Sequence, residues 1–145
     1  MKILLNICLV VLGVVLVFYV FPLARFHYTY VTPMMKVYRE ISYKPDPEGI
    51  ELFQSPELTE RSGYGDCDDY CILLQERLWQ KGHETQMVGY KEKGKDVRHY
   101  VLVFGNSVLD PTYGKVYPLN EYEKTHYVFR RPPRETIKRL SVNER

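Results

Sequence analysis

One stretch of the chain places apolar side chains at the spacing of a buried helix. Residues that are apolar or weakly polar recur along it at positions 67, 70, 71, 74 and 78, which fall on one face of a helix with 3.6 residues per turn. Asp66 is a typical helix-capping residue, and carboxylates such as Asp68 and Asp69 suit the first turn of a helix. Gly82 is typical of a helix end. The pattern predicts a buried helix that begins at Cys67, after a glycine-containing loop.

Three segments after this helix have the composition of β-strands. They cover residues 85–90, 97–104 and 107–112, and a charged turn with Gly94 separates the first two. Gly105-Asn106 reads as a two-residue hairpin connection, with glycine in the first central place as a type II′ turn requires. Residues 116–119 are a candidate for a further strand. The elements together predict an α+β domain in which the helix packs on an antiparallel sheet.

The hairpin determines which side chains share a face of this sheet. If Gly105-Asn106 is the loop, Val101 pairs with Asp110 and His99 pairs with Thr112. His99 and Asp110 then point to the same face and lie diagonally opposite one another, within reach. A slip of one residue would move Asp110 to the other face.

The N-terminal segment from Ile3 to Ala24 is apolar apart from Asn6. As a helix its 22 residues cover about 33 Å, enough for a bilayer core of about 30 Å. We favour an uncleaved membrane anchor, because the sequence before Ala24 lacks the small residue that a signal peptidase expects at the −3 place. A cleaved secretory signal is the alternative. The flanking basic residues leave the orientation open.

The remaining segments complete the domain organisation. Thr32-Pro33 is typical of a helix start, and a short helix is expected to follow, with its apolar face formed by Met34, Val37, Tyr38 and Ile41. Residues 43–56 contain three prolines and are expected to form an irregular loop. We divide the chain into a membrane anchor or signal sequence (1–24), one domain (25–129) and a basic C-terminal tail (130–145).

The composition of the chain narrows the number of domains, the class of partner and the disulfide bonds that can be expected. The chain has 145 residues, of which 45% are hydrophobic, so one small domain is expected. A net charge of +2 gives no case for a nucleic-acid partner. Cys8 lies in the apolar segment, and Cys67 and Cys71 are one helical turn apart, so no disulfide framework is implied.

Cys67, His99 and Asp110 are the residue types that covalent acyl chemistry requires. A cysteine at a helix start can act as nucleophile, a histidine can take its proton, and a carboxylate can orient the histidine ring. The residues by themselves leave a second interpretation open, in which Cys67 is a buried helix cysteine and His99 an ordinary strand histidine.

The order of these motifs resembles the transglutaminase-like superfamily, in particular the small bacterial transglutaminase-like cysteine peptidases. The motifs are GDCDDY on the helix, a histidine on a following strand, and LDPTYG from Leu109 to Gly114. The similar region, residues 63–114, covers about a third of the chain. The resemblance implies a small papain-like or transglutaminase-like domain and assigns the catalytic roles to Cys67, His99 and Asp110.

The resemblance also implies the type of reaction. Such an enzyme attacks an amide or peptide bond, forms a thioester on Cys67 and resolves it with water, so protein or peptide substrates are expected and no cofactor is required. The alternatives are a transferase that resolves the thioester with an amine, and a noncatalytic, membrane-anchored binding domain. The active-site tryptophan of many true transglutaminases has no evident counterpart, since Trp79 lies late in the helix and is expected to pack in the core.

The residues around Cys67 suggest two alternative metal sites, one for calcium and one for zinc. Some peptidases of this group depend on calcium held by acidic residues beside the nucleophile, and Asp66 and Asp68 occupy those places with Asp69 nearby. Helix capping by the same aspartates needs no metal. A zinc site is a weaker alternative, with the ligands Cys67, Cys71, His83 and His99.

The donors of the oxyanion hole are only partly predictable. The backbone N–H of Cys67 is the natural first donor, and Gln54 or Tyr64 could supply the second. The histidines other than His99 are expected at the surface or in packing roles; they are His27, His83 and His126.

Overall fold

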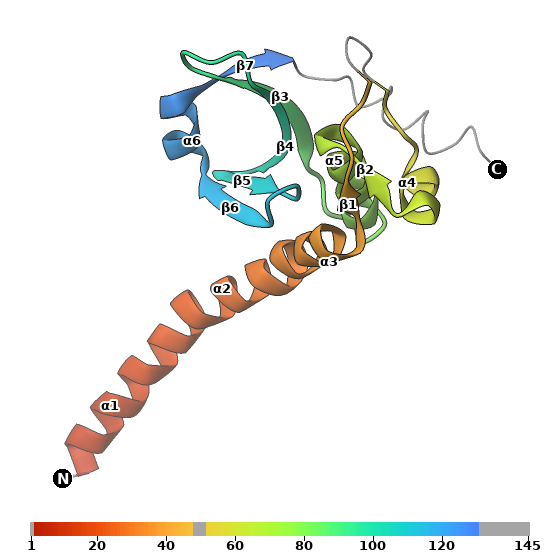
Figure 1. Ribbon diagram of the computed structural model, residues 1–145. Helices are drawn as coiled ribbons and strands as arrows, with labels where there is room; N and C mark the ends of the chain where they lie inside the picture. The colour runs from red at the N-terminus through yellow and green to blue at the C-terminus, as the bar shows by residue number, and fades with distance from the viewer. Residues whose placement is uncertain (1, 48–51, 131–145) are drawn as a thin grey trace.

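A long helical run leads into a small domain (Figure 1). The computed structural model describes residues 2–47 and 52–130. The run consists of α1 (Lys2–Val15), α2 (Phe21–Phe26) and α3 (Thr32–Glu40), joined by π-helical turns at Leu16–Val20 and His27–Val31. Between Leu5 and Glu40 it contains an 18-residue window with a mean hydropathy of 2.9, none of it buried. It is therefore a candidate membrane anchor or signal sequence.

The predicted helix is present as α3, which begins at Thr32 with Pro33 next to it, but it is not a separate helix, because the helical run reaches it without a break. Pro33 lies two residues after the end of the second π-helical turn, and Pro22 lies two residues after the end of the first. The wider π-turn relieves the clash that a proline ring makes with the preceding turn of a regular α-helix. The predicted apolar face packs on the domain through Met34, Val37 and Ile41, whereas Tyr38 is 43% exposed.

A five-stranded antiparallel sheet forms the centre of the domain, as predicted. Its strands lie in the order β6-β5-β4-β3-β7. The helix predicted from the apolar spacing is present as α5 (Cys67–Trp79) and packs on one face of the sheet, while α6 (Leu119–Thr125) closes the other side (Figure 1). The strand bounds are β3 (Gln86–Glu92), β4 (Arg98–Phe104), β5 (Ser107–Asp110), β6 (Lys115–Pro118) and β7 (His126–Arg130).

The β4–β5 hairpin has the predicted turn and most of the predicted register. Phe104 pairs with Ser107, and the next two pairs follow in step. Gly105 has a φ of +54°, which fits the first central place of a type II′ turn. The ladder ends at Leu109, so the expected pair of His99 with Thr112 is not formed. Pro111 explains the early end, because it has no N–H to donate to a ladder.

Five of the described helices and strands lie where sequence analysis assigned none. They are β1 (Ser42–Tyr43), α4 (Pro56–Ser62), β2 (Tyr64–Gly65), α6 and β7. The signal for α4 is visible in hindsight, since Ser55 caps the helix by accepting a hydrogen bond from the Leu58 N–H at 3.2 Å and Pro56 stands at its first position. The strands β1 and β2 (Tyr64–Gly65) form a two-stranded parallel sheet, which no local pattern predicts.

Two apolar clusters, one on each face of the large sheet, hold the domain together. The first joins α3 and α5 to the sheet and includes Met34, Val37, Tyr70, Leu74, Met87, Tyr100, Leu102 and Leu109. The second lies between the sheet and α6 and includes Val88, Tyr90, Val101, Val108 and Tyr122. The N-terminal helical run from α1 to α3, here called the stalk, contacts the first cluster. Its buried Tyr30 stacks on Phe104, with ring centroids 4.1 Å apart. Of the predicted basic tail, all residues after Arg130 lie outside the described residues.

Candidate active site

Cys67 is the first residue of α5, and its neighbours hold the helix start in place. The carboxylate of Asp66 accepts a hydrogen bond from the Asp68 N–H at 3.2 Å, and Asp69 accepts one from the Asp66 N–H at 3.2 Å. This reciprocal arrangement is a capping box, which satisfies N–H groups that a helix start leaves without partners. The cap at Asp66 was predicted, and the structure confirms it.

The loop before Cys67 is pressed tightly against the helix. A Cβ atom on Gly65 would lie 2.6 Å from the Cβ of Asp69, so only glycine fits there without a shift. Gln54 holds the other side of Asp69, because its N–H and its side-chain amide each donate to the carboxylate at 2.7 Å. Asp69 is therefore the anchor that joins the loop, the helix start and the residue 54 segment.

His99 and Asp110 form a hydrogen-bonded pair across the β4–β5 hairpin. The Nε2 of His99 lies 3.0 Å from an Asp110 carboxylate oxygen, and the side chains are 14% and 2% exposed. The second carboxylate oxygen accepts the Tyr113 N–H at 3.2 Å. The Tyr113 ring lies over the histidine, with ring centroids 5.4 Å apart. The pair therefore forms even though the strand ladder ends before it.

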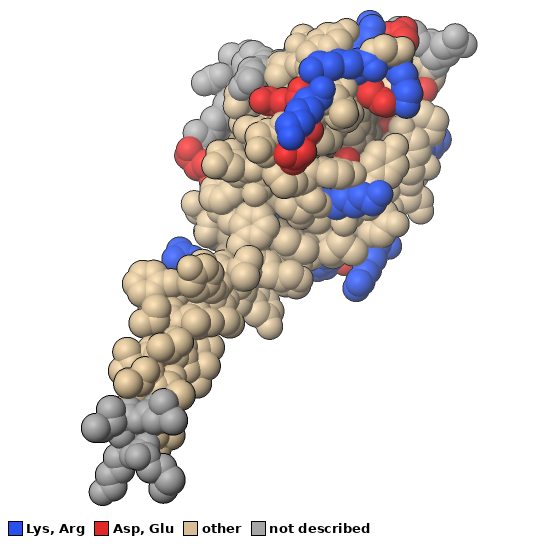
Figure 2. Space-filling model, turned by 90° about the vertical axis from the view of Figure 1, so that its left-hand side faces the viewer, with Lys and Arg blue, Asp and Glu red and all other residues tan. Residues whose placement is uncertain are grey.

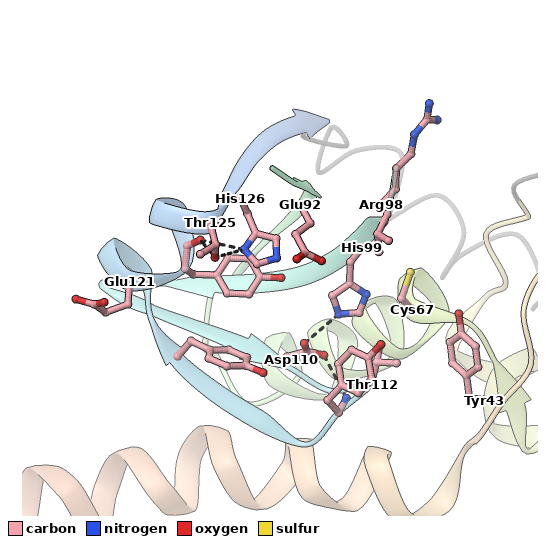
Figure 3. Close-up of a pocket in the computed structure, with 14 residues that line it drawn as sticks. Tyr43, Cys67, Glu92, Arg98, His99, Asp110, Thr112, Glu121, Thr125 and His126 are labelled. Carbon is pink, nitrogen blue, oxygen red and sulfur yellow. Dashed lines mark hydrogen bonds and ion pairs between the residues drawn. The ribbon is translucent and has the colours of Figure 1, made fainter. Parts of the chain in front are cut away.

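The three residues selected from the sequence line one pocket of about 350 Å³. Cys67 enters it from α5, and His99 and Asp110 enter it from β4 and β5 (Figure 3). With Nε2 of His99 directed to Asp110, the remaining ring nitrogen is turned toward the Cys67 side of the pocket (Figure 3). No hydrogen bond joins Cys67 to His99 in the described part of the chain.

The rest of the pocket is aromatic and charged. Tyr43 and Tyr113 stand near the cysteine, and Glu92 and Glu121 line its other parts. Both glutamates pair with lysines, at 2.7 Å to Lys95 and 2.7 Å to Lys124. Figure 2 shows one face of the domain with a hollow bordered by basic and acidic side chains.

The surroundings of Cys67 disfavour the thiolate. Burial raises the pKa of the Cys67 thiol from 9.0 to about 12, with further increases from the charges of Asp66 and Asp68. The backbone N–H of Tyr100 acts in the opposite direction and lowers this pKa. The thiol is therefore protonated at neutral pH in this arrangement and needs a base to become a nucleophile.

Three carboxylates gather at the start of α5. Ligand atoms of Asp66, Asp68 and Asp69 lie within 4.8 Å of one another. Asp68 is 1% exposed, and its Oδ1 has no hydrogen-bond partner among the described residues. Burial, followed by the neighbouring Asp66, raises the pKa of Asp68. A buried carboxylate oxygen without a partner beside two further carboxylates is a donor set suited to a hard cation.

The residues of the zinc alternative are not brought together. Cys67 begins α5, whereas His83 follows its far end and packs against Tyr30, with ring centroids 5.5 Å apart. Cys71 is fully buried in the apolar core, and Trp79 packs against the same core, as expected for both. His126, which was expected at the surface or in a packing role, lines the pocket. Its ring stacks on Tyr122, with ring centroids 4.1 Å apart.

The candidates for the second oxyanion donor do not reach the pocket. The side-chain amide of Gln54 is bound to Asp69. Tyr64 is 40% exposed, with the Lys44 ammonium 4.1 Å above its ring. Sequence analysis missed Tyr43, which does line the pocket. No local signal could have found it, because the β1–β2 pairing alone brings it beside Cys67.

Comparison with known proteins identifies the fold. No family model matches the sequence, and no curated protein matches it. Among solved structures, calcium-bound LapG of Legionella pneumophila matches with 18% identity and a TM-score of 0.60, over 70% of this chain and 61% of that chain. EGTA-treated LapG matches with 15% identity and a TM-score of 0.63, over 79% of this chain and 78% of that one.

The coverage and the sequence identity determine what the similarity to these structures shows. The chain spans 61% of the length of the calcium-bound LapG structure, and identities below 20% establish a shared fold rather than a shared substrate. LapG is a cysteine protease of the transglutaminase-like fold. The chain described here therefore has the transglutaminase-like fold that its sequence motifs predicted.

Proposed function

We propose that this protein is a thiol hydrolase of peptide or amide bonds in which Cys67 is the nucleophile, His99 the base and Asp110 the residue that orients His99. The observation that carries the proposal is the convergence of these side chains from α5, β4 and β5 on one pocket, with His99 and Asp110 joined at 3.0 Å. The transglutaminase-like fold shared with the LapG proteases supports it.

The hydrogen bond to Asp110 determines how His99 can act. An ionised carboxylate only accepts hydrogen bonds, so the Nε2 of His99 carries the proton of the neutral ring. The Nδ1 atom is then free to accept the proton of the Cys67 thiol. The thiol needs this help, because burial raises its pKa to about 12. His99 therefore works as a general base that removes the proton as the sulfur attacks.

The reaction then follows the chemistry of an acyl-thioester. The sulfur adds to the substrate carbonyl carbon, and the proton moves from the thiol to His99. His99 returns this proton to the departing amine as the C–N bond breaks, which leaves a thioester on Cys67. A water molecule, activated by the same histidine, hydrolyses the thioester and releases the acid.

Calcium is the cation that best fits the acidic cluster. We propose that Asp66 and Asp68 supply ligands, because the buried Oδ1 of Asp68 lacks a partner among the described residues and carboxylate oxygens are the ligands calcium prefers. Asp69 contributes less, since its oxygens already accept hydrogen bonds from Gln54 and Asp66. The matching LapG structures include a calcium-bound and an EGTA-treated form, which supports the choice of ion. Bound calcium would supply positive charge that offsets the repulsion among the carboxylates.

The apolar helix supports a membrane location. We propose that residues 1–24 anchor the chain in a membrane and that the domain stands directly at its surface. The first buried residue, Tyr30, follows the apolar segment by six positions, and the helix continues into α3 without a break. Peptide substrates would therefore be cleaved close to the membrane surface.

The first test is alkylation of Cys67 by iodoacetamide, in the full chain in detergent micelles with calcium present. Cys8→Ser and Cys71→Ser remove the other two cysteines of the chain as sources of signal. We expect rapid labelling at neutral pH in this background and a loss of at least about tenfold in His99→Ala. His83→Ala is the matched control, because His83 lies at the far end of α5, and it should label like the parent.

The opposite outcome would support the noncatalytic alternative. If labelling rises only near the ordinary cysteine pKa of about 8.5 or above it, and His99→Ala labels at the same rate, then His99 does not activate the thiol. The domain would in that case be a binding module that has kept the fold.

A further inference from the structure

The tetrahedral intermediate on Cys67 requires hydrogen-bond donors for its oxyanion. The first is the backbone N–H of Cys67, because the first N–H groups of a helix have no acceptor within the helix. An oxyanion hole generally contains a second donor, held rigidly in place before the reaction. The side-chain amide of Gln54 is bound to Asp69, and Tyr64 is not among the residues that line the pocket, so we look for the second donor at another residue.

Tyr43 is held on the nucleophile side of the pocket by the small parallel sheet. In the β1–β2 pairing Tyr43 lies opposite Gly65, and Gly65 precedes Cys67 by two residues. Backbone hydrogen bonds on either side of it, from the Ser42 N–H to Gly63 at 2.9 Å and from the Lys44 N–H to Gly65 at 2.8 Å, hold the strand in register. Because Gly65 is itself pressed against α5, the position of Tyr43 is tied to that of the cysteine.

The side chain of Tyr43 lies on the nucleophile side of the pocket. It lines the same pocket as Cys67, His99 and Asp110. Figure 3 shows its hydroxyl end beside Cys67, with His99 on the far side of the sulfur. A substrate carbonyl carbon bonded to the sulfur would therefore have its base on one side and the phenol on the other.

The phenol is present in the form that donates. Partial burial raises the pKa of Tyr43 above its usual value of 10.0, and electrostatic interactions with the neighbouring acidic groups, first Cys67 and then Asp66, raise it further. Tyr43 therefore keeps its proton at neutral pH. A neutral tyrosine hydroxyl can donate to a developing oxyanion without adding a charge to the site.

We propose that the hydroxyl of Tyr43 is the second oxyanion donor of this enzyme. It donates to the carbonyl oxygen when the Cys67 sulfur bonds to the carbonyl carbon and the π electrons of the C=O bond move onto that oxygen. The donation ends when the intermediate collapses and the C–N bond breaks. The proposal rests on the hydrolase function proposed above and adds to it a residue that touches the substrate.

The experiment compares two reactions of the same sulfur. Alkylation by iodoacetamide forms no oxyanion, whereas acylation by p-nitrophenyl acetate forms one. Both second-order rate constants are measured on the full chain in detergent micelles with calcium, in a background that carries both Cys8→Ser and Cys71→Ser. The variants are Tyr43→Phe, which removes only the hydroxyl, and Tyr64→Phe as the matched control on the neighbouring strand.

We expect Tyr43→Phe to slow acylation by about 10²-fold while alkylation stays within twofold of the parent. Tyr64→Phe should change neither rate. Acylation at the parental rate in Tyr43→Phe would overturn the proposal. An equal loss of both reactions would also overturn it, because the tyrosine would then act on the thiol or on the fold and not on the oxyanion.

The two proposals fail in different ways. If the parent is alkylated but not acylated, or if His99→Ala is acylated as fast as the parent, the hydrolase function itself is wrong and the role of Tyr43 falls with it. If the parent is acylated, His99→Ala is not, and Tyr43→Phe behaves as the parent, then only the role of Tyr43 is wrong.

Discussion

The two sides of the pocket are built in different ways. On the histidine side, His99 and Asp110 satisfy one another at 3.0 Å, and a regular hairpin carries both residues. On the nucleophile side, three carboxylates crowd the helix start around Cys67, and one buried oxygen of Asp68 has no partner among the described residues. On the histidine side the two polar side chains are paired with one another, whereas on the nucleophile side burial and the crowding of carboxylates disfavour the charged form of Asp68.

The difference explains what each side contributes to chemistry. In the proposed reaction, the hydrogen bond to Asp110 prepares a base, because it leaves one nitrogen of His99 free to accept a proton. The surroundings of Cys67 work against the nucleophile, because burial and the nearby aspartates raise the pKa of its thiol to about 12. The proposed function therefore makes a cation at the aspartates and a base across the pocket two separate requirements, and each can be removed without touching the other.

The largest expected effect comes from breaking the histidine side. Asp110→Asn should lower the rate of peptide or ester hydrolysis by about 10²- to 10⁴-fold, because an asparagine can offer its amide N–H to His99 and stabilise the wrong ring tautomer. Asn also keeps an oxygen for the Tyr113 N–H, so the fold should be retained. Steady-state kinetics and a circular dichroism spectrum provide the measurement.

Asp96→Asn is the control for this change. Asp96 is exposed, lies in the turn before β4 and forms an ion pair with Lys91 at 2.6 Å. It should leave hydrolysis unchanged. Equal activity in Asp110→Asn and the parent would mean that Asp110 does not orient the catalytic base.

Removing calcium from the nucleophile side should have an effect of intermediate size, and this effect should be on the stability of the folded chain. Calcium at about one hundred times its dissociation constant should stabilise the folded chain by about 2.7 kcal/mol relative to an excess of EGTA. In Asp68→Asn this gain should disappear, and the EGTA-treated variant should unfold at a higher temperature than the EGTA-treated parent, because a buried, repelled carboxylate is gone. Thermal melts with and without calcium measure both differences.

Glu57→Gln is the matched control for the charge that Asp68→Asn removes. Glu57 lies exposed in the first turn of α4, outside the cluster, and its variant should keep the full calcium response. A calcium response that survives in Asp68→Asn would place the ion elsewhere on the chain.

The smallest expected effects are those of replacing one glycine on each side of the pocket. Gly65 lies on the nucleophile side, and Gly105 lies in the hairpin of the histidine side. Gly65→Ala forces a Cβ against Asp69 and should reduce the free energy of unfolding by about 1–3 kcal/mol. Gly105→Ala has open space around the new methyl group but must adopt a φ of +54°, which should cost about 1–2 kcal/mol. Denaturant unfolding gives both values.

Hydrolysis separates the two glycine variants further. Gly65→Ala displaces the loop that carries Cys67 and should lower the rate, whereas Gly105→Ala acts at an exposed turn distant from the pocket and should not. If Gly105→Ala lowered the rate more than Gly65→Ala, the nucleophile loop would tolerate displacement better than the geometry implies.

Local signals in the sequence determined the elements that carry the chemistry. The apolar spacing and the capping residue Asp66 predicted α5 and the place of Cys67 at its start. The glycine turn at Gly105 predicted the register of the hairpin, and with it the approach of His99 to Asp110. These predictions succeeded because helix caps and two-residue turns depend on neighbours in the sequence.

Only the tertiary structure decided how these elements are joined and what surrounds them. The continuation of the stalk through Pro33, the second-layer helix α6 and the edge strand β7 all depend on packing partners that are distant along the chain. The approach of Tyr43 to Cys67 depends on strand pairing across 22 residues of sequence, from residue 43 to residue 65. The burial of Asp68, which leaves its oxygen without a partner in the described chain, follows from the same packing. A sequence pattern records which residues have the capacity to react, and burial and long-range contacts then determine their charge and their partners.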